Sequence, residues 1–347
     1  MKIKFSLLRY LRFAWPFLAL IPAVATAQTP PTLPESEGEL ASFIDRNPQN
    51  NTAALTLLLL KVDQLKTELI VSNFRQEYGE RIRMHRVSYP SITPDRVTIP
   101  GYVFTPANMP KGEKRPGLLM LHGGAATQLS HEWFRWIAEG VGRGYIVMFP
   151  EYRGSSGHGD TIAETNYGVT DLADVRAAAA FLARHENVDG SRLGIFGHSR
   201  GGMLTLRALQ EEPTRFKAAV DVAGLADMVA FMSYKSDPRR KGIAAGEHYQ
   251  GKLPSENLRA YIEVSPAFFI EKIQTPVLVI STTGDTIVPY QLHNQRVVEA
   301  LRAYGKTHDS HLYNEAIGSH SFLFDDTEEA ADCLRRSFAW FDKHLKP

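Results

Sequence analysis

The chain has 347 residues, enough for one large domain or two modest ones. With 44% hydrophobic and 22% charged residues, its composition is globular, which excludes a disordered or collagen-like chain. Lysine and arginine number 39 against 38 aspartates and glutamates, so the basic excess typical of nucleic-acid binding is absent. The single cysteine, Cys333, cannot form an internal disulfide, and no cysteine–histidine cluster indicates zinc. We therefore expect no nucleic-acid partner, no metal and no other cofactor.

Residues 1–27 have the three-part pattern of a secretory signal peptide. A basic start precedes an apolar run, and Ala25-Thr26-Ala27 supplies a small-residue cleavage site before Gln28. The apolar run is short for a membrane span and contains two prolines, although an uncleaved inner-membrane anchor is the alternative. Cleavage would remove four basic residues and no acid, and would change the formal charge from +1 to −3. We predict a periplasmic or secreted protein with no stable membrane span after signal cleavage.

Residues 28–83 are expected to form a flexible lead-in followed by a helical extension. The lead-in is rich in proline, threonine and glutamate. From Asn51 to about Arg83, leucines and other apolar residues recur at helical spacing, and no glycine or proline interrupts them before Gly79. We predict one or two helices there. A leucine stripe usually packs within its own chain, and a homodimer formed through this segment is the alternative.

Residues 84–347 are expected to form one α/β domain, because short apolar runs alternate with helical patterns. This alternation predicts a mostly parallel sheet with helices on both faces and a site at the carboxyl ends of the strands. Pro100-Gly101 predicts a bulge or bend in the second strand. The expected strands are 85–89, 96–104, 117–121, 145–149, 193–196, 218–222, 277–280 and 308–313, and the expected helices are 131–142, 170–185, 200–211, 291–304 and 328–345.

The segment Gly197-His198-Ser199-Arg200-Gly201 stands between an expected strand and an expected helix. This G-x-S-x-G pattern is typical of a nucleophile elbow, a strained turn that exposes a serine hydroxyl and has no room for side chains at its two glycines. The helix that begins at Arg200 adds an amide N–H and a positive dipole end where negative charge develops. We interpret Ser199 as a nucleophile, with Gly197, His198 and Gly201 shaping its turn.

A nucleophilic serine requires a base and an orienting acid, which in this type of fold follow it in the order acid, histidine. Asp285 lies in the loop after strand 277–280, and His320 follows strand 308–313. We predict a Ser199–Asp285–His320 triad that needs no metal. Other candidates fit less well. His308 and His311 lie within the expected strand, His344 lies at the C-terminus and His198 lies in the elbow. Asp325 and Asp326 stand before the last helix, and Glu315 is too close to His320 in sequence.

The second oxyanion donor is expected from the loop after the third strand. His122-Gly123-Gly124-Ala125 occupies that place, and its glycines allow the backbone to approach a substrate closely. We predict an oxyanion hole formed by the Arg200 amide and the N–H of either Gly124 or Ala125.

The sequence resembles the catalytic domain of the prolyl oligopeptidase family of serine peptidases over about residues 85–345. The segments that carry the resemblance are His122-Gly-Gly, Tyr152-Arg153-Gly-Ser, Gly-His-Ser199-Arg-Gly-Gly, Tyr261 to Pro266 and Asp285-Thr-Ile-Val-Pro289. The resemblance implies an α/β-hydrolase fold, the triad named above, and an oxyanion hole formed by the Arg200 amide and an N–H of the Gly124 loop.

Some features depart from that family. Large members carry a β-propeller, but residues 28–83 are too few and too helical to form one, so we expect a single-domain member. Arg200 stands where many members have an aromatic residue and Ala125 where many have proline, so proline or dipeptide specificity is not implied. Residues 227–265 are a possible small cap, whose basic turn at 237–242 either faces water or favours a substrate carboxylate.

The expected function is that of an exported serine hydrolase that cleaves short peptides through an acyl-enzyme. A carboxylesterase acting on small or acylated-sugar esters would use the same triad, because the tetrahedral intermediate is the same. A non-catalytic binding protein that retains the fold is the third alternative. In each case the expected partner is a short peptide or a small molecule.

Overall fold

The computed structural model describes residues 51–124, 127–163 and 166–347. The predicted signal peptide, the lead-in up to residue 50 and Ala125 lie outside the described residues. The chain divides into two compact units, residues 1–59 and 60–347, and the second contains the sheet and the site. Among the described helices, none combines the length and apolar character needed to cross a bilayer.

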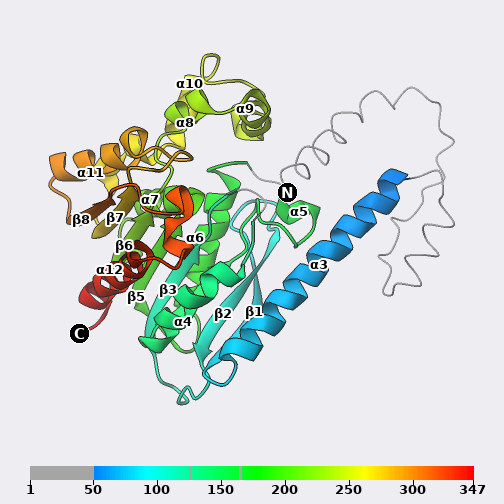
Figure 1. The fold of residues 1–347 in the computed structure, drawn as a ribbon, viewed down its shortest axis with the longest axis vertical. Coiled ribbons are helices and arrows are strands. Elements are labelled where there is room, and N and C mark those ends of the chain that lie inside the picture. Colours follow the sequence, from blue (N-terminus) through cyan, green and yellow to red (C-terminus); the bar gives the residue numbers. More distant parts are fainter. Residues whose placement is uncertain (1–50, 125–126, 164–165) are drawn as a thin grey trace. The chain divides into compact units, whose positions relative to one another are not determined.

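In the second unit, eight strands form one sheet in the order β1-β2-β4-β3-β5-β6-β7-β8 (Figure 1). β2 runs antiparallel to both of its neighbours, and every other neighbouring pair is parallel. The predicted, mostly parallel α/β-hydrolase sheet is confirmed. The strands are β1 (Ile82–Pro90), β2 (Thr98–Pro106), β3 (Arg115–Leu121), β4 (Ile146–Pro150), β5 (Val188–His198), β6 (Ala218–Val222), β7 (Val277–Thr282) and β8 (His308–Tyr313).

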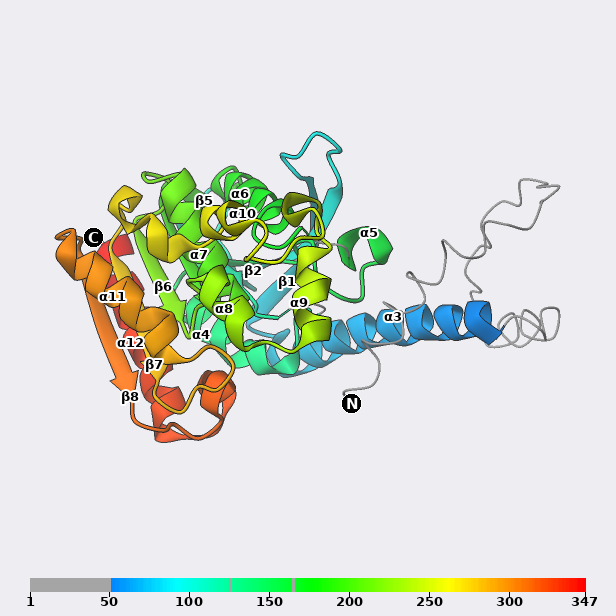
Figure 2. The ribbon, with the colours of Figure 1, turned by 90° about the horizontal axis from the view of Figure 1, so that it is seen from above.

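Helices cover both faces of the sheet (Figure 2). Buried side chains of α6, α7 and α11 share a core with one face, and those of α4, α12 and the second half of α3 share a core with the other. The α-helices are α3 (Asn51–Tyr78), α4 (Phe134–Gly142), α5 (Asp160–Ala163), α6 (Thr170–Ala183), α7 (Arg200–Glu211), α8 (Met228–Tyr234), α9 (Asp237–Ala244), α10 (Leu258–Glu263), α11 (Asn294–Ala303) and α12 (Glu328–Leu345). Short 3-10 helices are η2 (His131–Trp133), η3 (Glu247–Tyr249), η4 (Pro266–Phe268), η5 (Ile270–Lys272), η6 (Tyr290–Leu292) and η7 (Ser319–Phe324).

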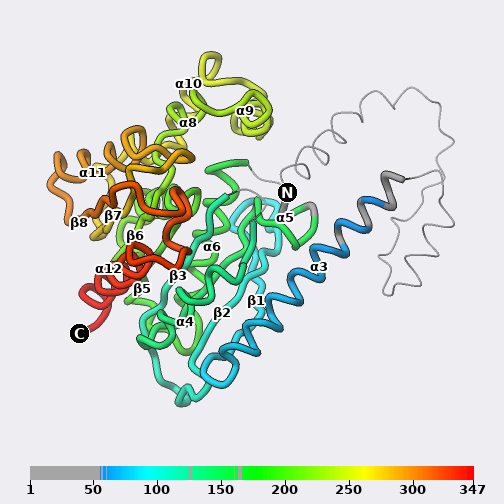
Figure 3. The backbone as a smooth tube through the Cα atoms, viewed as in Figure 1, coloured from blue at the N-terminus to red at the C-terminus, as the bar shows by residue number. Residues whose placement is uncertain are grey.

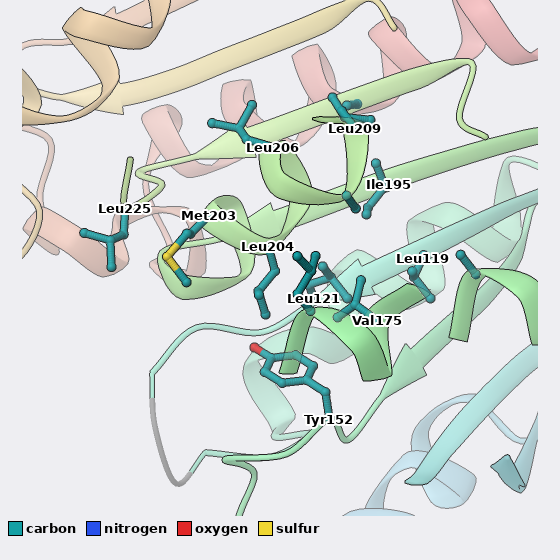
Figure 4. Close-up of a cluster of buried hydrophobic side chains, with 14 of the residues drawn as sticks. Leu119, Leu121, Tyr152, Val175, Ile195, Met203, Leu204, Leu206, Leu209 and Leu225 are labelled. Carbon is teal, nitrogen blue, oxygen red and sulfur yellow. The ribbon is translucent and has the colours of Figure 1, made fainter. Parts of the chain in front are cut away.

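The central strands β3, β6 and β7 are buried at almost every position because both of their faces are covered. In β3, Leu119 and Leu121 enter the core beneath α6 and α7, whereas Leu118 and Met120 enter the core on the other face. Figure 4 shows the first of these cores, in which leucines of β3 meet side chains of α6 and α7. The buried strands keep the β5–α7 turn in a fixed place.

The structure departs from the sequence-based expectations at several boundaries. The pairing of β1 with β2 continues without a register shift through Pro100 and Gly101, so the predicted bulge is absent. Gly101 is needed for close packing instead, because a Cβ there would lie 3.1 Å from the Phe149 carbonyl oxygen. The extension is the single helix α3. The expected helix 131–142 consists of the 3-10 turn η2 followed by α4, and the expected helix 291–304 consists of the end of η6 followed by α11. Asp325 and Asp326 precede α12 but do not cap it: Thr327 accepts the N–H of Ala330.

The connection from β6 to β7 contains α8, α9 and α10, as the backbone trace in Figure 3 shows. This is the segment 227–265 in which a small cap was expected. Two of its aromatic residues serve as packing: Tyr249 and Tyr261 are fully buried, with ring centroids 4.6 Å apart. The Tyr249 hydroxyl donates to the carbonyl of Tyr167 at 2.6 Å and so joins this segment to the loop before α6.

Candidate active site

Ser199 occupies a tight turn between β5, which ends at His198, and α7, which begins at Arg200. Its φ of +59° lies in the left-handed region, which costs a serine free energy. A Cβ at Gly197 would lie 2.0 Å from the carbonyl oxygen of Gly201, and one at Gly201 would lie 2.3 Å from that of Leu121. Both glycines are therefore required sterically, as a nucleophile elbow demands.

Ser199, His320 and Asp285 are joined by two hydrogen bonds at the carboxyl ends of the strands. Nε2 of His320 lies 2.8 Å from Oγ of Ser199, and Nδ1 lies 2.7 Å from Oδ2 of Asp285. The other oxygen, Oδ1, accepts the N–H groups of Ile287 and Val288, both at 2.8 Å. Because the carboxylate accepts from Nδ1, the Nε2 lone pair faces the serine hydroxyl.

His198 has a second role besides its place in the turn. Its Nε2–H donates to the backbone carbonyl of His320 at 2.9 Å, and the two rings lie 4.8 Å apart between centroids. Burial, with a further contribution from the neighbouring His320, lowers the pKa of His198 to about 3. A neutral ring therefore holds the backbone of the residue that faces Ser199.

The loop after β3 approaches the serine closely. A Cβ at Gly123 would lie 2.8 Å from the Cβ of Ser199, so only glycine fits there, and Gly124 has a φ of +69°. The N–H of Arg200 stands at the start of α7, directly after Ser199. Ala125 is outside the described residues, so the choice between the amides of Gly124 and Ala125 stays a prediction.

The side chain of Arg200 joins the start of α7 to this loop. It is completely buried, and its Nε donates to Oδ2 of Asp171 at 2.9 Å, with a second bond from Nη2 to the same oxygen. Nη1 donates to the carbonyl of Gly124 at 3.2 Å, and Nη2 donates to that of Arg153 at 3.0 Å. The guanidinium thus fixes two loops against the first residue of the helix.

The side chains of His122 and Tyr152 support the loop after β3. Their rings stack with centroids 4.4 Å apart, and the Tyr152 hydroxyl donates to the carbonyl of His122. Nε2 of His122 lies 2.9 Å from Oγ of Ser155 and 3.5 Å from Oε2 of the fully buried Glu151. Burial raises the pKa of Glu151, but His122 and its neighbour His158 outweigh this effect and lower the pKa to about 2.

Arg153 lies outside the immediate surroundings of Ser199. Its guanidinium donates to both oxygens of Asp174, at 2.8 and 2.9 Å, and to Asp95 at 3.0 Å. It therefore anchors the Tyr152-Arg153 segment to α6 and to the β1–β2 connection.

Sequence reasoning missed the acidic partners of the two arginines. Asp171 and Asp174 stand three residues apart in the first half of α6, which places them on neighbouring positions of one helix face. Each is fully buried and each pairs with an arginine, Arg200 or Arg153. The spacing of two acids at the start of a predicted helix was the available signal, but it also fits an exposed first turn.

Comparison with known proteins decides the family. The sequence model of the prolyl oligopeptidase family matches residues 132–347. The chain belongs to the prolyl oligopeptidase family. This confirms the resemblance drawn from the sequence and places the chain among the serine hydrolases. The described residues contain a single sheet and no β-propeller.

Among its relatives, the chain is 27% identical over 245 residues to the acylamino-acid-releasing enzyme of Mus musculus, covering 69% of this chain and 33% of that protein. It is 27% identical over 273 residues to the uncharacterized peptidase YuxL of Bacillus subtilis, covering 76% and 40%. The chain thus spans less than half the length of these relatives.

Two solved peptidase structures have similar folds. A puromycin-hydrolyzing peptidase of Mycobacterium tuberculosis is 26% identical, with a TM-score of 0.62, and the match covers 76% of this chain and 39% of that one. The acylaminoacyl peptidase of Pyrococcus horikoshii is 21% identical, with a TM-score of 0.63 and coverage of 79% and 43%. The second likeness concerns the fold alone.

Among the described residues, no group of three or more His, Cys, Asp or Glu side chains could hold a metal ion.

His198 should make the stability of the protein depend on pH. Its pKa is about 3 in the folded protein against an ordinary value of 6.5, so between these values the unfolded chain binds a proton that the folded protein does not. The stability is complete above pH 6.5 and falls below it, by about 2 kcal/mol at pH 5 from this group. Urea unfolding at pH 7 and pH 5 should show a smaller loss for His198→Gln than for the wild type. Replacing the exposed His131 by Gln is the control, and an equal loss in His198→Gln and the wild type would contradict the assignment.

Proposed function

We propose that the chain is an exported serine peptidase that cleaves short peptides through an acyl-enzyme, with Ser199, His320 and Asp285 as its catalytic triad. The observation that carries this proposal is the pair of hydrogen bonds, 2.8 and 2.7 Å long, that joins the serine hydroxyl to the imidazole and the imidazole to the carboxylate. A strained turn holds the hydroxyl, and a helix start lies directly beside it.

In the proposed reaction, Oγ of Ser199 attacks the scissile carbonyl while Nε2 of His320 takes its proton. Asp285 stabilises the resulting imidazolium and keeps its Nδ1–H in place. The oxyanion accepts the N–H of Arg200 and that of Gly124 or Ala125, and each such donor is worth ~10²–10³ in turnover. His320 then returns the proton to the leaving amine, and a water molecule hydrolyses the ester by the same steps.

Peptide bonds are the proposed substrates because relatives similar over most of this chain bear names of peptidases. They are named acylamino-acid-releasing enzymes and a puromycin-hydrolyzing peptidase. The chain covers about a third to two fifths of those proteins, so their individual substrates do not transfer to it. Membership of the prolyl oligopeptidase family supports amide cleavage without fixing the sequence that is cleaved.

Replacing Ser199 by Ala should abolish labelling by a fluorophosphonate probe and lower kcat by ~10⁴ or more, because the nucleophile is removed. The matched control is Ser191→Ala, which removes an exposed hydroxyl at the opposite end of β5 that bonds only locally to Asp189. This control should label like the wild type. Labelling that survives in Ser199→Ala would show that another residue is the nucleophile.

A panel of aminoacyl p-nitroanilides and p-nitrophenyl esters separates the peptidase from a carboxylesterase. We expect turnover of both classes, because a site that expels an amine must protonate it and can also expel the better phenolate leaving group. Turnover of esters with none of anilides would favour the carboxylesterase. Neither turnover nor probe labelling would favour a binding protein.

Export is proposed from the pattern of residues 1–27. Amino-terminal sequencing of the protein recovered from its native host should find Gln28 first. A chain that begins at Met1 would contradict cleavage and favour the membrane anchor.

A further inference from the structure

We propose that this site favours substrates that carry a carboxylate close to the scissile bond, bound by Lys235 and Arg239 of the cap segment. The inference rests on the proposed hydrolase function and adds a substrate class to it. It concerns two cations that both come from the connection between β6 and β7.

Lys235 lies next to the loop that holds the triad acid. It directly follows α8, and its Nζ donates to the carbonyl of Ile287 at 2.8 Å. The N–H of the same Ile287 donates to Oδ1 of Asp285. The ammonium also lies 4.5 Å from the ring centroid of Phe231 and 4.6 Å from that of Tyr234. Ile287 therefore bonds this cation through its carbonyl and, through its N–H, the carboxylate that bonds His320.

Arg239 contacts the same aromatic ring, that of Tyr167, as Arg200. Its guanidinium carbon is 5.9 Å from the ring centroid of Tyr167, and that of Arg200 is 4.3 Å from the same centroid. Arg200 follows Ser199 directly. Tyr167 is buried, so its ring forms a fixed spacer between Arg239 and the start of α7.

Within the described part of the chain, these two cations have no acidic partner. Among the described residues, neither has a carboxylate within 4.0 Å, whereas Arg200 is paired with Asp171 and Arg240 with Asp237. Both are partly buried, and burial together with the charge of Arg239 lowers the pKa of Lys235, against an opposing effect of Asp285. Holding two like charges partly out of water is costly, and a bound anion would reduce that cost.

The basic turn found in the sequence is therefore not one uniform surface. Arg240 is paired with the first residue of α9, and Lys241 is exposed. Arg239 alone of the three contacts the Tyr167 ring. Short peptides carry negative charge as acidic side chains or as a terminal carboxylate, and both are anions that a guanidinium and an ammonium bind.

Matched substrate pairs test the inference. On the acyl side, acetyl-Asp p-nitroanilide is compared with acetyl-Asn p-nitroanilide; on the leaving side, acetyl-Ala-Ala is compared with its terminal amide. We expect kcat/KM to be roughly tenfold higher for the charged member of at least one pair. This ratio should fall as salt rises from 50 to 500 mM, because the interaction is partly exposed. The responding pair tells which carboxylate is recognised.

Variants connect the ratio to the two cations. Arg239→Gln and Lys235→Gln should each lower the charged-to-neutral ratio severalfold, whereas Arg239→Lys should restore most of it because it keeps the charge. Lys241→Gln is the matched control: it removes one positive charge from the exposed side of the same helix and should leave the ratio and the activity unchanged. Thermal unfolding verifies that each variant is folded.

Two results would overturn the inference. One is a ratio at or below one for both pairs in the wild type, and the other is a ratio that both glutamine variants leave unchanged. Fluorophosphonate labelling of the same preparations separates this failure from that of the proposed function. Labelling with turnover of neutral substrates refutes only the carboxylate preference, whereas loss of labelling and of all turnover contradicts the hydrolase and, with it, this inference.

Discussion

The left-handed backbone of Ser199 is the constraint on which the rest of the site depends. A conformation of this kind costs about 1–3 kcal/mol and persists only where its surroundings fix it. Here the N–H of Ser199 donates to the carbonyl of Val222 at 3.0 Å, and its own carbonyl accepts from Leu225 at 3.1 Å. β5 lies between β3 and β6 in the sheet, and α7 is buried along most of its length. Because the turn cannot relax without breaking this sheet, the hydroxyl stays fixed at its tip, facing His320.

A second constraint is electrostatic. One helix, α6, provides both Asp171 and Asp174, and these acids fix the guanidinium groups of Arg200 and Arg153. Buried ion pairs are weak evidence for stability, since desolvation offsets the attraction between the charges. Removing one partner is nevertheless destabilising, because it leaves the other charge buried and unpaired. Their consequence here is positional: Arg200 also binds the carbonyls of Gly124 and Arg153, so the loops after β3 and β4 are fixed to the helix that follows Ser199.

The sequence predicted those parts of the fold that local patterns determine. The bounds expected for β6, β8, α7 and α12 agree with the structure. For α7 and α12, helical spacing of apolar residues delimits the element. The predicted serine, aspartate and histidine meet at the sheet edge because a parallel sheet brings its carboxyl ends together. What could not be predicted depends on contacts distant in sequence: the bond from His198 to the His320 carbonyl, the burial of Asp171, and the difference between Arg239 and its neighbour Arg240.

The cap segment and the triad acid are mechanically connected. Nδ1 of His293 accepts the N–H groups of Ala226 and Asp227, which leaves its Nε2–H to donate to the Tyr234 hydroxyl at 2.7 Å. That hydroxyl donates in turn to the carbonyl of Ile287, which Lys235 also binds. Since the N–H of Ile287 holds Asp285, the loop of the acid is fixed by residues of the segment that carries Lys235 and Arg239. A substitution in α8 can therefore alter the orientation of His320 through Asp285 without touching the triad, because both are connected through the peptide unit of Ile287.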